Sequence, residues 1–275
     1  MKLSIITINL NNASGLRKTI ESVVSQSSRD FEYIVIDGGS TDGSIEVIKE
    51  FETRITYWIS EPDNGIYHAM NKGIRAAQGE YCQFLNSGDW LVNELVVEKI
   101  LNVIPDCDIF IGNVITTRPD GKIRVGKALR EVSFMTFYRS TLPHSSAYIR
   151  RSLYDKYGLY DESLLIVGDW KWYLVVAGLH DANIVFTDIA VSFFDSNGIS
   201  NRDKLLANAE RRKVLKELIP SPILADYDKY NFEIDQIDRI KRYPLFYRIV
   251  WFFERCLFKV DKWKATYCGW QRSIR

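Results

Sequence analysis

Polar side chains follow several short apolar runs in the first third of the sequence, and their types are suited to binding an ionic ligand. The residues concerned are Thr7, Asn9, Asp37, Asn86, Ser87 and Asp89. Carboxylate and amide oxygens accept hydrogen bonds and are the ligands that hard divalent cations prefer. A second acidic position, Asp169, stands alone between a glycine and a tryptophan. These residues make one ligand site only if the fold brings their segments together.

The apolar runs at residues 3–8, 32–37, 55–60 and 80–86 are too short for helices and rich in β-branched or aromatic residues, which predicts strands. Apolar residues at helical spacing lie between them. Strands that alternate with helices predict a mostly parallel sheet with helices on both faces, and such sheets bind ligands beyond the carboxyl ends of their strands. Loops are polar in any case, but four polar strand ends favour a shared site.

The alternation of strands and helices weakens after residue 107. The sequence predicts a strand near 108–115, a hairpin turn at Asp120 and Gly121, a helix near 169–180 and a strand over 183–194. Beyond residue 200 the pattern is helical, with a break at Pro220 and Pro222. We therefore expect one α/β domain over residues 1–200, made of halves 1–107 and 108–200, and a helical extension over 201–275.

Composition excludes several classes of protein. With 275 residues and 46% hydrophobic content, the chain forms a sizeable core. A net charge of +1 provides no overall attraction to nucleic acid. The four cysteines are widely spaced and form no CxxC pair, which favours reduced thiols in a cytoplasmic protein. We find no signal peptide and no apolar run of the roughly 18 residues that a membrane span needs.

Six segments, in this order and spacing, resemble family 2 glycosyltransferases of the glycosyltransferase A fold. They are IITINLNNASGL, IVIDGGSTDGS, SEPDNGIYHAMNKGIRAAQGEY, FLNSGDWL, PHSSAYIRR and GDWKWYL. The resemblance covers about residues 1–200, and EPDNGIYHAMNKGI is similar to enzymes of bacterial O-antigen and exopolysaccharide assembly. It implies transfer of one sugar from a nucleotide diphosphate donor, with residues 1–107 binding the nucleotide and 108–200 binding the acceptor.

The resemblance implies that Asp37, with Thr7 beside it, contacts the uracil or ribose of a UDP-sugar, and it places Asn9 in the same donor site. The alternative is that Asp37 and Asp42 both cap the following helix; we expect capping from Asp42 only. The GGSTDG segment lacks the GxGxxG spacing of a dinucleotide-binding loop and follows the second strand instead of the first.

The end of the fourth strand is the expected metal site. A departing nucleotide diphosphate carries growing negative charge, which a cation held by Asp89 would neutralise. Many relatives have an acid-rich cluster at this position, whereas this chain has Asn86, Ser87 and Gly88 before Asp89. Magnesium commonly binds through one or two protein carboxylates together with phosphates and water, so we expect Mn²⁺ or Mg²⁺. The alternative is that Asp89 caps a following helix.

Asp169 is the expected general base, because an attacking sugar hydroxyl must lose its proton. Trp170 and Trp172 beside it would shield the carboxylate from water. The family resemblance implies an acidic residue that serves as the catalytic base at this motif, and inversion of the anomeric configuration. Gly168 stands where relatives carry a second acid, which leaves Asp169 alone. The alternative is a helix cap flanked by structural tryptophans.

Four further residues are expected to bind the donor or acceptor. Asp63 flanks the start of the GIYHAMNKG helix and Asn71 lies further along it; both would contact the donor, although capping explains Asp63 as well. His144 is expected in an exposed loop, where it would contact phosphate or acceptor. Ser200 ends a segment resembling the loop that closes over the pyrophosphate, and a simple turn is the alternative.

Residues 239–275 form a basic, aromatic tail. The tail holds ten Lys or Arg against Glu254 and Asp261, a surplus of eight, together with Trp251, Trp263 and Trp270. Such side chains suit the headgroup region of a membrane. The alternative is a helix that packs on the main domain or in a homodimer. No motif for reading nucleic acid accompanies the tail.

Together these observations predict a metal-dependent, inverting glycosyltransferase that moves a sugar from a nucleotide diphosphate donor, a UDP-sugar, to a lipid-linked glycan or polysaccharide. The expected location is the cytoplasm, with peripheral contact at the inner face of the membrane. The alternative is a non-catalytic nucleotide-sugar or glycan-binding protein that kept the fold. Turnover of the sugar nucleotide discriminates between them.

Overall fold

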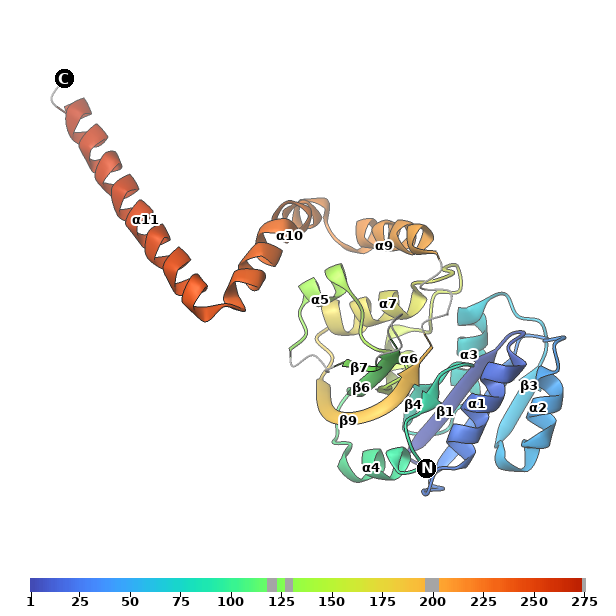
Figure 1. The fold of residues 1–275 in the computed structure, drawn as a ribbon. Coiled ribbons are helices and arrows are strands. Elements are labelled where there is room, and N and C mark those ends of the chain that lie inside the picture. Colours follow the sequence, from blue (N-terminus) through green and yellow to red (C-terminus); the bar gives the residue numbers. More distant parts are fainter. Residues whose placement is uncertain (118–122, 127–130, 196–202, 274–275) are drawn as a thin grey trace. The chain divides into compact units, whose positions relative to one another are not determined.

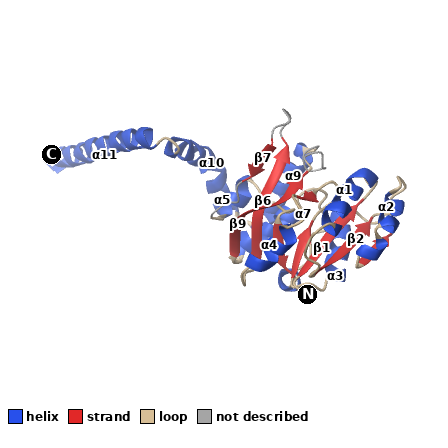
Figure 2. Ribbon diagram, turned by 60° about the horizontal axis from the view of Figure 1, so that its bottom comes forward, coloured by secondary structure: helices blue, strands red, loops and turns tan. Residues whose placement is uncertain are grey.

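The computed structural model describes residues 1–117, 123–126, 131–195 and 203–273. The chain divides into two compact units, Met1–Leu215 and Lys216–Arg275. The first unit contains a nine-stranded sheet. Its strand order is β3 (Tyr57–Ser60), β2 (Phe31–Asp37), β1 (Leu3–Asn9), β4 (Tyr81–Phe84), β8 (Ala147–Arg150), β6 (Ile109–Thr117), β9 (Ile184–Phe194) and β5 (Trp90–Leu91), with β7 (Ile123–Gly126) paired to β6. Figure 1 shows helices along the sheet, and Figure 2 shows its strands in red. This mostly parallel α/β architecture confirms the predicted fold class.

The first half alternates strands and helices as the sequence predicts. Its elements are β1 (Leu3–Asn9), α1 (Ala13–Val24), β2 (Phe31–Asp37), α2 (Ser44–Glu50), the 3₁₀ helix η1 (Glu52–Arg54), β3 (Tyr57–Ser60), α3 (Ile66–Ala76) and β4 (Tyr81–Phe84). The first four strands are parallel neighbours. Asn9 is opposite Asp37, and Asp37 is opposite Ser60, so the polar strand ends lie side by side.

Helices cover both faces of these strands. On one face, Leu16, Ile20 and Val23 of α1 join a core with alternate residues of β1 and β2. On the other face α3 approaches β1 so closely that a Cβ on Gly73 would lie 2.4 Å from Ile6 Cγ2. Helix α3 ends at Ala76 with Ala77 as its C-cap, so a C-terminal cap at Gly79, which the sequence also suggests, is not formed. Gly79 instead passes under β1, where a Cβ would meet the backbone of Ser4.

The second half of the sheet turns antiparallel. It comprises β5 (Trp90–Leu91), α4 (Val96–Val103), β6 (Ile109–Thr117), β7 (Ile123–Gly126), α5 (Phe134–Arg139), β8 (Ala147–Arg150), α6 (Ser152–Tyr157), α7 (Gly168–Tyr173), the π-helix η2 (Leu174–Leu179) and β9 (Ile184–Phe194). Strand β8 runs antiparallel to β4 and β6, whereas β9 is parallel to β6 and antiparallel to β5. The β6–β7 pairing confirms the expected hairpin, although its turn residues lie outside the described part.

The remaining elements are helical, as expected. They are α9 (Lys204–Leu218), α10 (Ser221–Lys241) and α11 (Pro244–Ser273). Pro220 is the N-cap of α10, and Pro222 lies in its first turn, where proline is tolerated. Within the described residues, no helix combines the length and hydropathy needed to cross a membrane. Cys82 and Cys107 are buried free thiols and Cys256 is an exposed one, in line with the expected reduced cysteines.

Candidate active site

The carboxylate of Asp37 is the centre of the polar strand ends. Oδ1 accepts hydrogen bonds from Asn9 Nδ2 at 2.7 Å and Ser40 Oγ at 2.6 Å. Oδ2 accepts from Ser60 Oγ at 2.7 Å and from the backbone N–H groups of Ser40 and Gly39 at 2.9 and 3.2 Å. Burial raises the pKa of Asp37, but the bonds from Ser40, Ser60 and Asn9 outweigh burial and hold that pKa below its usual value. Asp37 is therefore a rigid, ionised group.

Asp42, not Asp37, serves the neighbouring helices. Its Oδ1 accepts from Ser44 N at 3.1 Å at the start of α2, and its Oδ2 accepts from Ala13 N at 2.8 Å at the start of α1. The expected contact of Asp42 with the start of α2 is therefore present, whereas donor contact by Asp37 stays a prediction. In the Asp37 cluster, Asn9 Oδ1 is buried without a hydrogen-bond partner among the described residues, which leaves an acceptor for a ligand.

Thr7 lies inside the sheet, two residues before the end of β1. Its fully buried hydroxyl donates to the carbonyl of Leu85 at 2.8 Å and lies 3.0 Å from Tyr33 Oη. The side chain thus joins three neighbouring strand segments. A donor contact of Thr7 stays a prediction, and in this structure its hydroxyl is engaged within the protein.

Asp63 reaches the Asp37 loop because Gly38 has no side chain. A Cβ on Gly38 would lie 2.5 Å from Asp63 Oδ2, a separation that real Cβ atoms do not adopt. The other oxygen of Asp63 accepts from the N–H of Gly65, the N-cap of α3, at 3.0 Å. Asp63 therefore contacts the start of α3, as the capping alternative expects, and also lies beside Gly38, while its contact with a donor stays a prediction.

The segment Asn86 to Asp89 is anchored beside the end of β1. Ser87 N donates to Ile8 O at 3.1 Å, one residue before Asn9. Thr19 of α1, which is fully buried, donates to the carbonyl of Asp89 at 2.6 Å and accepts from Gly88 N at 3.0 Å. Sequence reasoning missed Thr19, and the available signal was a hydroxyl on the otherwise apolar face of α1.

Asp89 is buried and does not cap a helix. Strand β5 follows it directly and α4 begins only at Val96, so the capping alternative is wrong. Its Oδ1 accepts from the backbone N–H of Asp195 at 2.7 Å. Burial raises the pKa of Asp89 to about 7; the hydrogen bond from Asp195 lowers it, and the charge of Asp195 raises it. Asp195, which directly follows β9, is a neighbour of Asp89 that the sequence did not reveal.

The chemistry around Asp89 fits a divalent cation. Gly88 has φ +104°, and a Cβ there would lie 3.1 Å from Asp195 Oδ2, so the second carboxylate occupies the space that a side chain at position 88 would need. Asn86 Oδ1 is buried without a partner among the described residues. No group of three or more His, Cys, Asp or Glu side chains in the described part forms a metal site. The oxygens present suit an ion that keeps phosphate and water ligands.

Asp169 lies in the first turn of α7, whose N-cap is Val167, so Asp169 is not the helix cap of the alternative interpretation. The phenol of Tyr67, from α3, lies 3.0 Å from Asp169 Oδ1 and 2.6 Å from the carbonyl of Ile166. A Cβ on Gly168 would lie 2.8 Å from the Tyr67 ring. The absent acid at position 168 therefore makes room for Tyr67, which approaches the remaining acid.

Both tryptophans beside Asp169 are buried and fixed by their ring nitrogens. Trp170 Nε1 donates to Phe137 O and Trp172 Nε1 donates to Gly158 O, each at 2.8 Å. These contacts hold α7 on two sides. Asp169 itself is at intermediate exposure, and shielding of its carboxylate by the two rings stays a prediction.

His144 is not in an exposed loop, so that expectation is wrong. Its ring stacks on Phe84 with centroids 5.0 Å apart, and Nε2 lies 3.0 Å from Tyr160 Oη. Burial lowers the pKa of His144 and the charge of Asp169 raises it, with burial prevailing. His144 is therefore a neutral ring close to Asp169, packed among aromatic side chains that the sequence did not associate with it.

Asn71 is buried, and its amide is used within the protein. Nδ2 donates to Tyr160 O at 2.9 Å and to Glu162 Oε1 at 2.7 Å, while Oδ1 accepts from Tyr160 N at 3.0 Å. The side chain therefore holds the segment 160–162 against α3. Ser200, the remaining expected site residue, lies outside the described residues.

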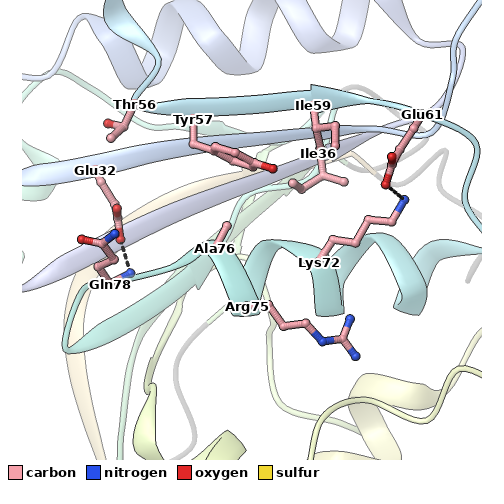
Figure 3. Close-up of a pocket in the computed structure, with 10 residues that line it drawn as sticks. All are labelled: Glu32, Ile36, Thr56, Tyr57, Ile59, Glu61, Lys72, Arg75, Ala76 and Gln78. Carbon is pink, nitrogen blue, oxygen red and sulfur yellow. Dashed lines mark hydrogen bonds and ion pairs between the residues drawn. The ribbon is translucent and has the colours of Figure 1, made fainter.

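A pocket of about 570 Å³ lies elsewhere, between the edge strand β3 and α3 (Figure 3). Its lining includes Tyr57, Ile59 and Arg75, and an ion pair of 2.8 Å joins Lys72 to Glu61 at one end. None of the residues predicted for the donor, the metal or the base lines this pocket. The candidate active site is therefore the strand-end cluster with Asp89 and Asp169.

Replacing Asp37 with Asn tests the rigid, ionised cluster. At neutral pH we expect the variant to be less stable by about 2 kcal/mol, because a neutral amide offers one acceptor oxygen to five donors. The pKa of Asp37 is lower in the folded state than its value of about 4 in the unfolded state, so the ionised carboxylate stabilises the fold at pH values above about 4. This stabilisation is lost as pH falls through the folded-state pKa. The stability difference should therefore shrink below about pH 4. Urea unfolding at several pH values measures it.

Asp30→Asn is the matched control, because Asp30 is an exposed aspartate just before β2. We expect no change in its unfolding free energy beyond about 0.5 kcal/mol. A difference between Asp37→Asn and the parent that stays constant down to about pH 3 would contradict an ionised Asp37 held by hydrogen bonds.

Comparisons with known proteins show which family the chain resembles. The family model for glycosyl transferase family 2 matches residues 4–163. An uncharacterised glycosyltransferase of Mycobacterium tuberculosis is 34% identical over 182 residues, which cover 64% of this chain and 68% of that protein. A glycosyltransferase of PGL/p-HBAD biosynthesis from Mycobacterium bovis is 29% identical over 62% of this chain and 67% of its own length.

Solved structures show the same fold at low sequence identity. TarS of S. aureus in complex with UDP-GlcNAc has a TM-score of 0.61 and 17% identity, over 80% of this chain and 72% of that chain. A longer TarS structure is covered over only 43% of its length. The mannosyltransferase PcManGT of Pyrobaculum calidifontis, with GDP-Man and Mn²⁺, has a TM-score of 0.55 and 17% identity, over 77% of this chain and 60% of that chain. The family match, which spans more than half of the chain, shows that this protein belongs to glycosyl transferase family 2.

Proposed function

We propose that this chain transfers a sugar from a UDP-sugar to a hydroxyl of a lipid-linked glycan or polysaccharide, with inversion at the anomeric carbon. One observation carries the proposal. The start of α3 and the turn before it contact both the proposed donor site around Asp37 and the proposed base Asp169. Asp63 lies over Gly38, beside Asp37, and Tyr67, four residues later, contacts Asp169. A donor held at Asp37 and an acceptor held at Asp169 would therefore meet across a single turn of helix.

On the donor side, we assign hydrogen bonding of the nucleotide to Asn9, Asp37, Asp63, Asn86 and Ser87. The unpartnered oxygens of Asn9 and Asn86 support this assignment, since buried acceptors without partners are costly unless a ligand satisfies them. Thr7 acts by holding neighbouring strand segments together, and Asn71 acts by holding the segment 160–162 against α3. His144, which is neutral and near Asp169, belongs to the acceptor side. That TarS was solved with UDP-GlcNAc supports a UDP-sugar as donor.

In the proposed reaction, the acceptor hydroxyl oxygen forms a bond to the anomeric carbon while the bond to the diphosphate oxygen breaks. Asp169 takes the hydroxyl proton, and the electron pair of the broken bond leaves with the nucleotide diphosphate. Tyr67 holds the Asp169 carboxylate, and burial followed by the charge of Asp169 raises the pKa of Tyr67 well above its usual value. The phenol therefore stays protonated and donates its hydrogen bond.

We further propose that Asp89 and Asp195 hold the Mn²⁺ or Mg²⁺ that accompanies the donor. Such an ion neutralises charge on a departing diphosphate. The buried carboxylate of Asp89 supports this role, because two close acids are disfavoured without a cation. The Mn²⁺ found with PcManGT, a protein of similar fold, is further support.

Asp169→Asn keeps the shape of the side chain and removes its basic site. Sugar transfer should fall by about 10² to 10⁴, which is about 3 to 5 kcal/mol of barrier. UDP affinity should stay within about twofold, because the nucleotide contacts lie around Asp37 and Asp89. Transfer is measured with the acceptor by release of UDP, and UDP affinity by calorimetry on the same preparation. Transfer within about fivefold of the parent would exclude a general-base role.

Asp89→Asn tests the cation. We expect UDP affinity in the absence of metal to be unchanged and the gain in affinity on adding Mn²⁺ to be largely lost, by at least about tenfold. The fold should remain, because removing a buried charge relieves a desolvation cost. Asp188→Asn, an exposed aspartate in β9, is the control. An undiminished Mn²⁺-dependent gain in UDP affinity would show that Asp89 does not hold the metal.

For the helical tail we propose peripheral contact with an anionic membrane surface. Helix α11 exposes large apolar side chains, among them Phe246, Trp251, Phe252, Phe253 and Phe258, all at least 48% exposed. Arg255 lies over the Trp251 ring, with 3.7 Å to its centroid, so charge and aromatic surface occur together. Trp263 and Trp270 lie in the part of α11 whose side chains are not described. Basic residues attract anionic headgroups, and the apolar side chains enter the interface.

The triple variant Trp251→Ser, Phe252→Ser and Phe253→Ser tests this contact. Loss of three large apolar side chains should reduce sedimentation with phosphatidylglycerol vesicles by at least about tenfold, since each contributes about 1.5–3 kcal/mol when buried. Ile123→Ser with Val125→Ser in β7 removes exposed apolar surface elsewhere and should have no effect. Unchanged sedimentation of the triple variant would contradict the proposal, and a simultaneous loss of dimers would identify an interface between copies.

A further inference from the structure

The carboxylate of Glu210, in the middle of α9, accepts hydrogen bonds from three consecutive backbone N–H groups. Oε1 accepts from Leu165 N at 2.7 Å, and Oε2 accepts from Ile166 N at 3.0 Å and Val167 N at 3.2 Å. These three residues lead directly into Gly168 and Asp169 at the start of α7. One side chain from a distant segment therefore accepts the hydrogen bonds of the three backbone N–H groups that lead to the proposed base.

Backbone chemistry explains why such a partner is needed. The first N–H groups of a helix, and those of the segment that leads into it, have no acceptor within the helix. The N-cap of α7 is Val167, whose side chain cannot accept a hydrogen bond, and no side-chain cap is present. Hydrogen bonds to an ionised carboxylate are stronger than those between neutral groups. Glu210 therefore supplies, from α9, the hydrogen-bond acceptor that the residues at the start of α7 do not provide.

Both backbone polar groups of Ile166 are held by side chains from other helices. Its N–H donates to Glu210 Oε2 at 3.0 Å, and its carbonyl lies 2.6 Å from Tyr67 Oη, which is also 3.0 Å from Asp169 Oδ1. Helix α9 on one side and α3 on the other thus fix the backbone three residues before the base. Movement of this peptide would carry the Asp169 carboxylate with it.

The residue after Glu210 also lies near Asp169. The Arg211 guanidinium is 5.0 Å from the centroid of the Trp170 ring. Burial lowers the pKa of Arg211, and the negative charge of Asp169 acts in the opposite direction. Glu210 and Arg211, two consecutive side chains of α9, therefore both contact the segment 165–170.

We propose that Glu210 is a positioning residue for Asp169, and that α9 is part of the active site although it lies beyond the segment that the family model matches. This inference rests on the proposed function, because it assigns Glu210 to the catalytic role of Asp169. Glu210 does not touch the reacting atoms. It sets the backbone from which the base projects, and a displacement of about 1 Å at such a site can reduce rate by about 10².

The test uses the full chain with Glu210→Ala and the milder Glu210→Gln, and with Glu217→Gln as an exposed control on the same helix. Hydrogen exchange followed by mass spectrometry reports the amides of residues 165–167. We expect exchange at least about tenfold faster in both Glu210 variants, since each loses the charged acceptor. The turnover number for transfer should fall about 10- to 100-fold, with UDP affinity within about twofold of the parent. The control should match the parent in all three measurements.

A double-mutant cycle with Tyr67→Phe sharpens the test. Both side chains act on the peptide at Ile166, so their effects on turnover should be non-additive, with the double variant no more than about threefold below the worse single variant. Multiplicative effects would contradict a shared action through this peptide. A merely structural role would lower the melting temperature and leave the turnover number of folded protein intact.

The outcomes separate this inference from the function that it rests on. If the parent transfers sugar and Glu210→Ala keeps turnover within about twofold, Glu210 does not position the base and the proposed function stands. Unchanged amide exchange in Glu210→Ala would likewise overturn the inference. If the parent itself fails to transfer sugar from any UDP-sugar with acceptor and Mn²⁺, the proposed function and this inference are both refuted.

Discussion

Helix α3 and the turn just before it contact the segments on which the proposed active site depends. Tyr67 and Asn71, four residues apart in α3, point in similar directions, and Asp63 lies in the turn that leads into the helix. Asp63 lies over Gly38 in the donor loop, Tyr67 contacts the Asp169 segment, and Asn71 binds the backbone and side chain of the segment 160–162. Rigid packing of α3 on β1, at Gly73, fixes all three contacts to the sheet.

Three glycines of the site have a common physical meaning. At Gly38, Gly88 and Gly168, the space that a side chain would fill is occupied by a polar side chain from another element. The occupants are Asp63, Asp195 and Tyr67, at 2.5, 3.1 and 2.8 Å from the ideal Cβ positions. The sequence shows few acidic residues beside these glycines. The fold adds polar side chains there from other parts of the chain.

The strands of the first half and the convergence of their polar ends could be predicted, because both depend on local periodicity and on the geometry of parallel sheets. Asp89 and Asp169 were also recognisable from short motifs. Asp195 could not be recognised in this way, since it reaches Asp89 only through the antiparallel pairing of β5 with β9. Glu210 could not be recognised either. In the sequence it is one of many charged residues on a predicted helix, and its contact with residues 165–167 arises only in the fold. His144 was misjudged because Phe84 and Tyr160, which enclose it, belong to other segments.

The close fit of Tyr67 against Gly168 restricts how this sequence can diverge. An acid at position 168 would collide with the phenol ring, and a smaller residue at position 67 would leave Asp169 without its hydrogen bond. Neither position can change alone without cost, so the two should vary together among homologous chains. In evolutionary terms, paired acids at positions 168 and 169 require a smaller or displaced side chain at position 67.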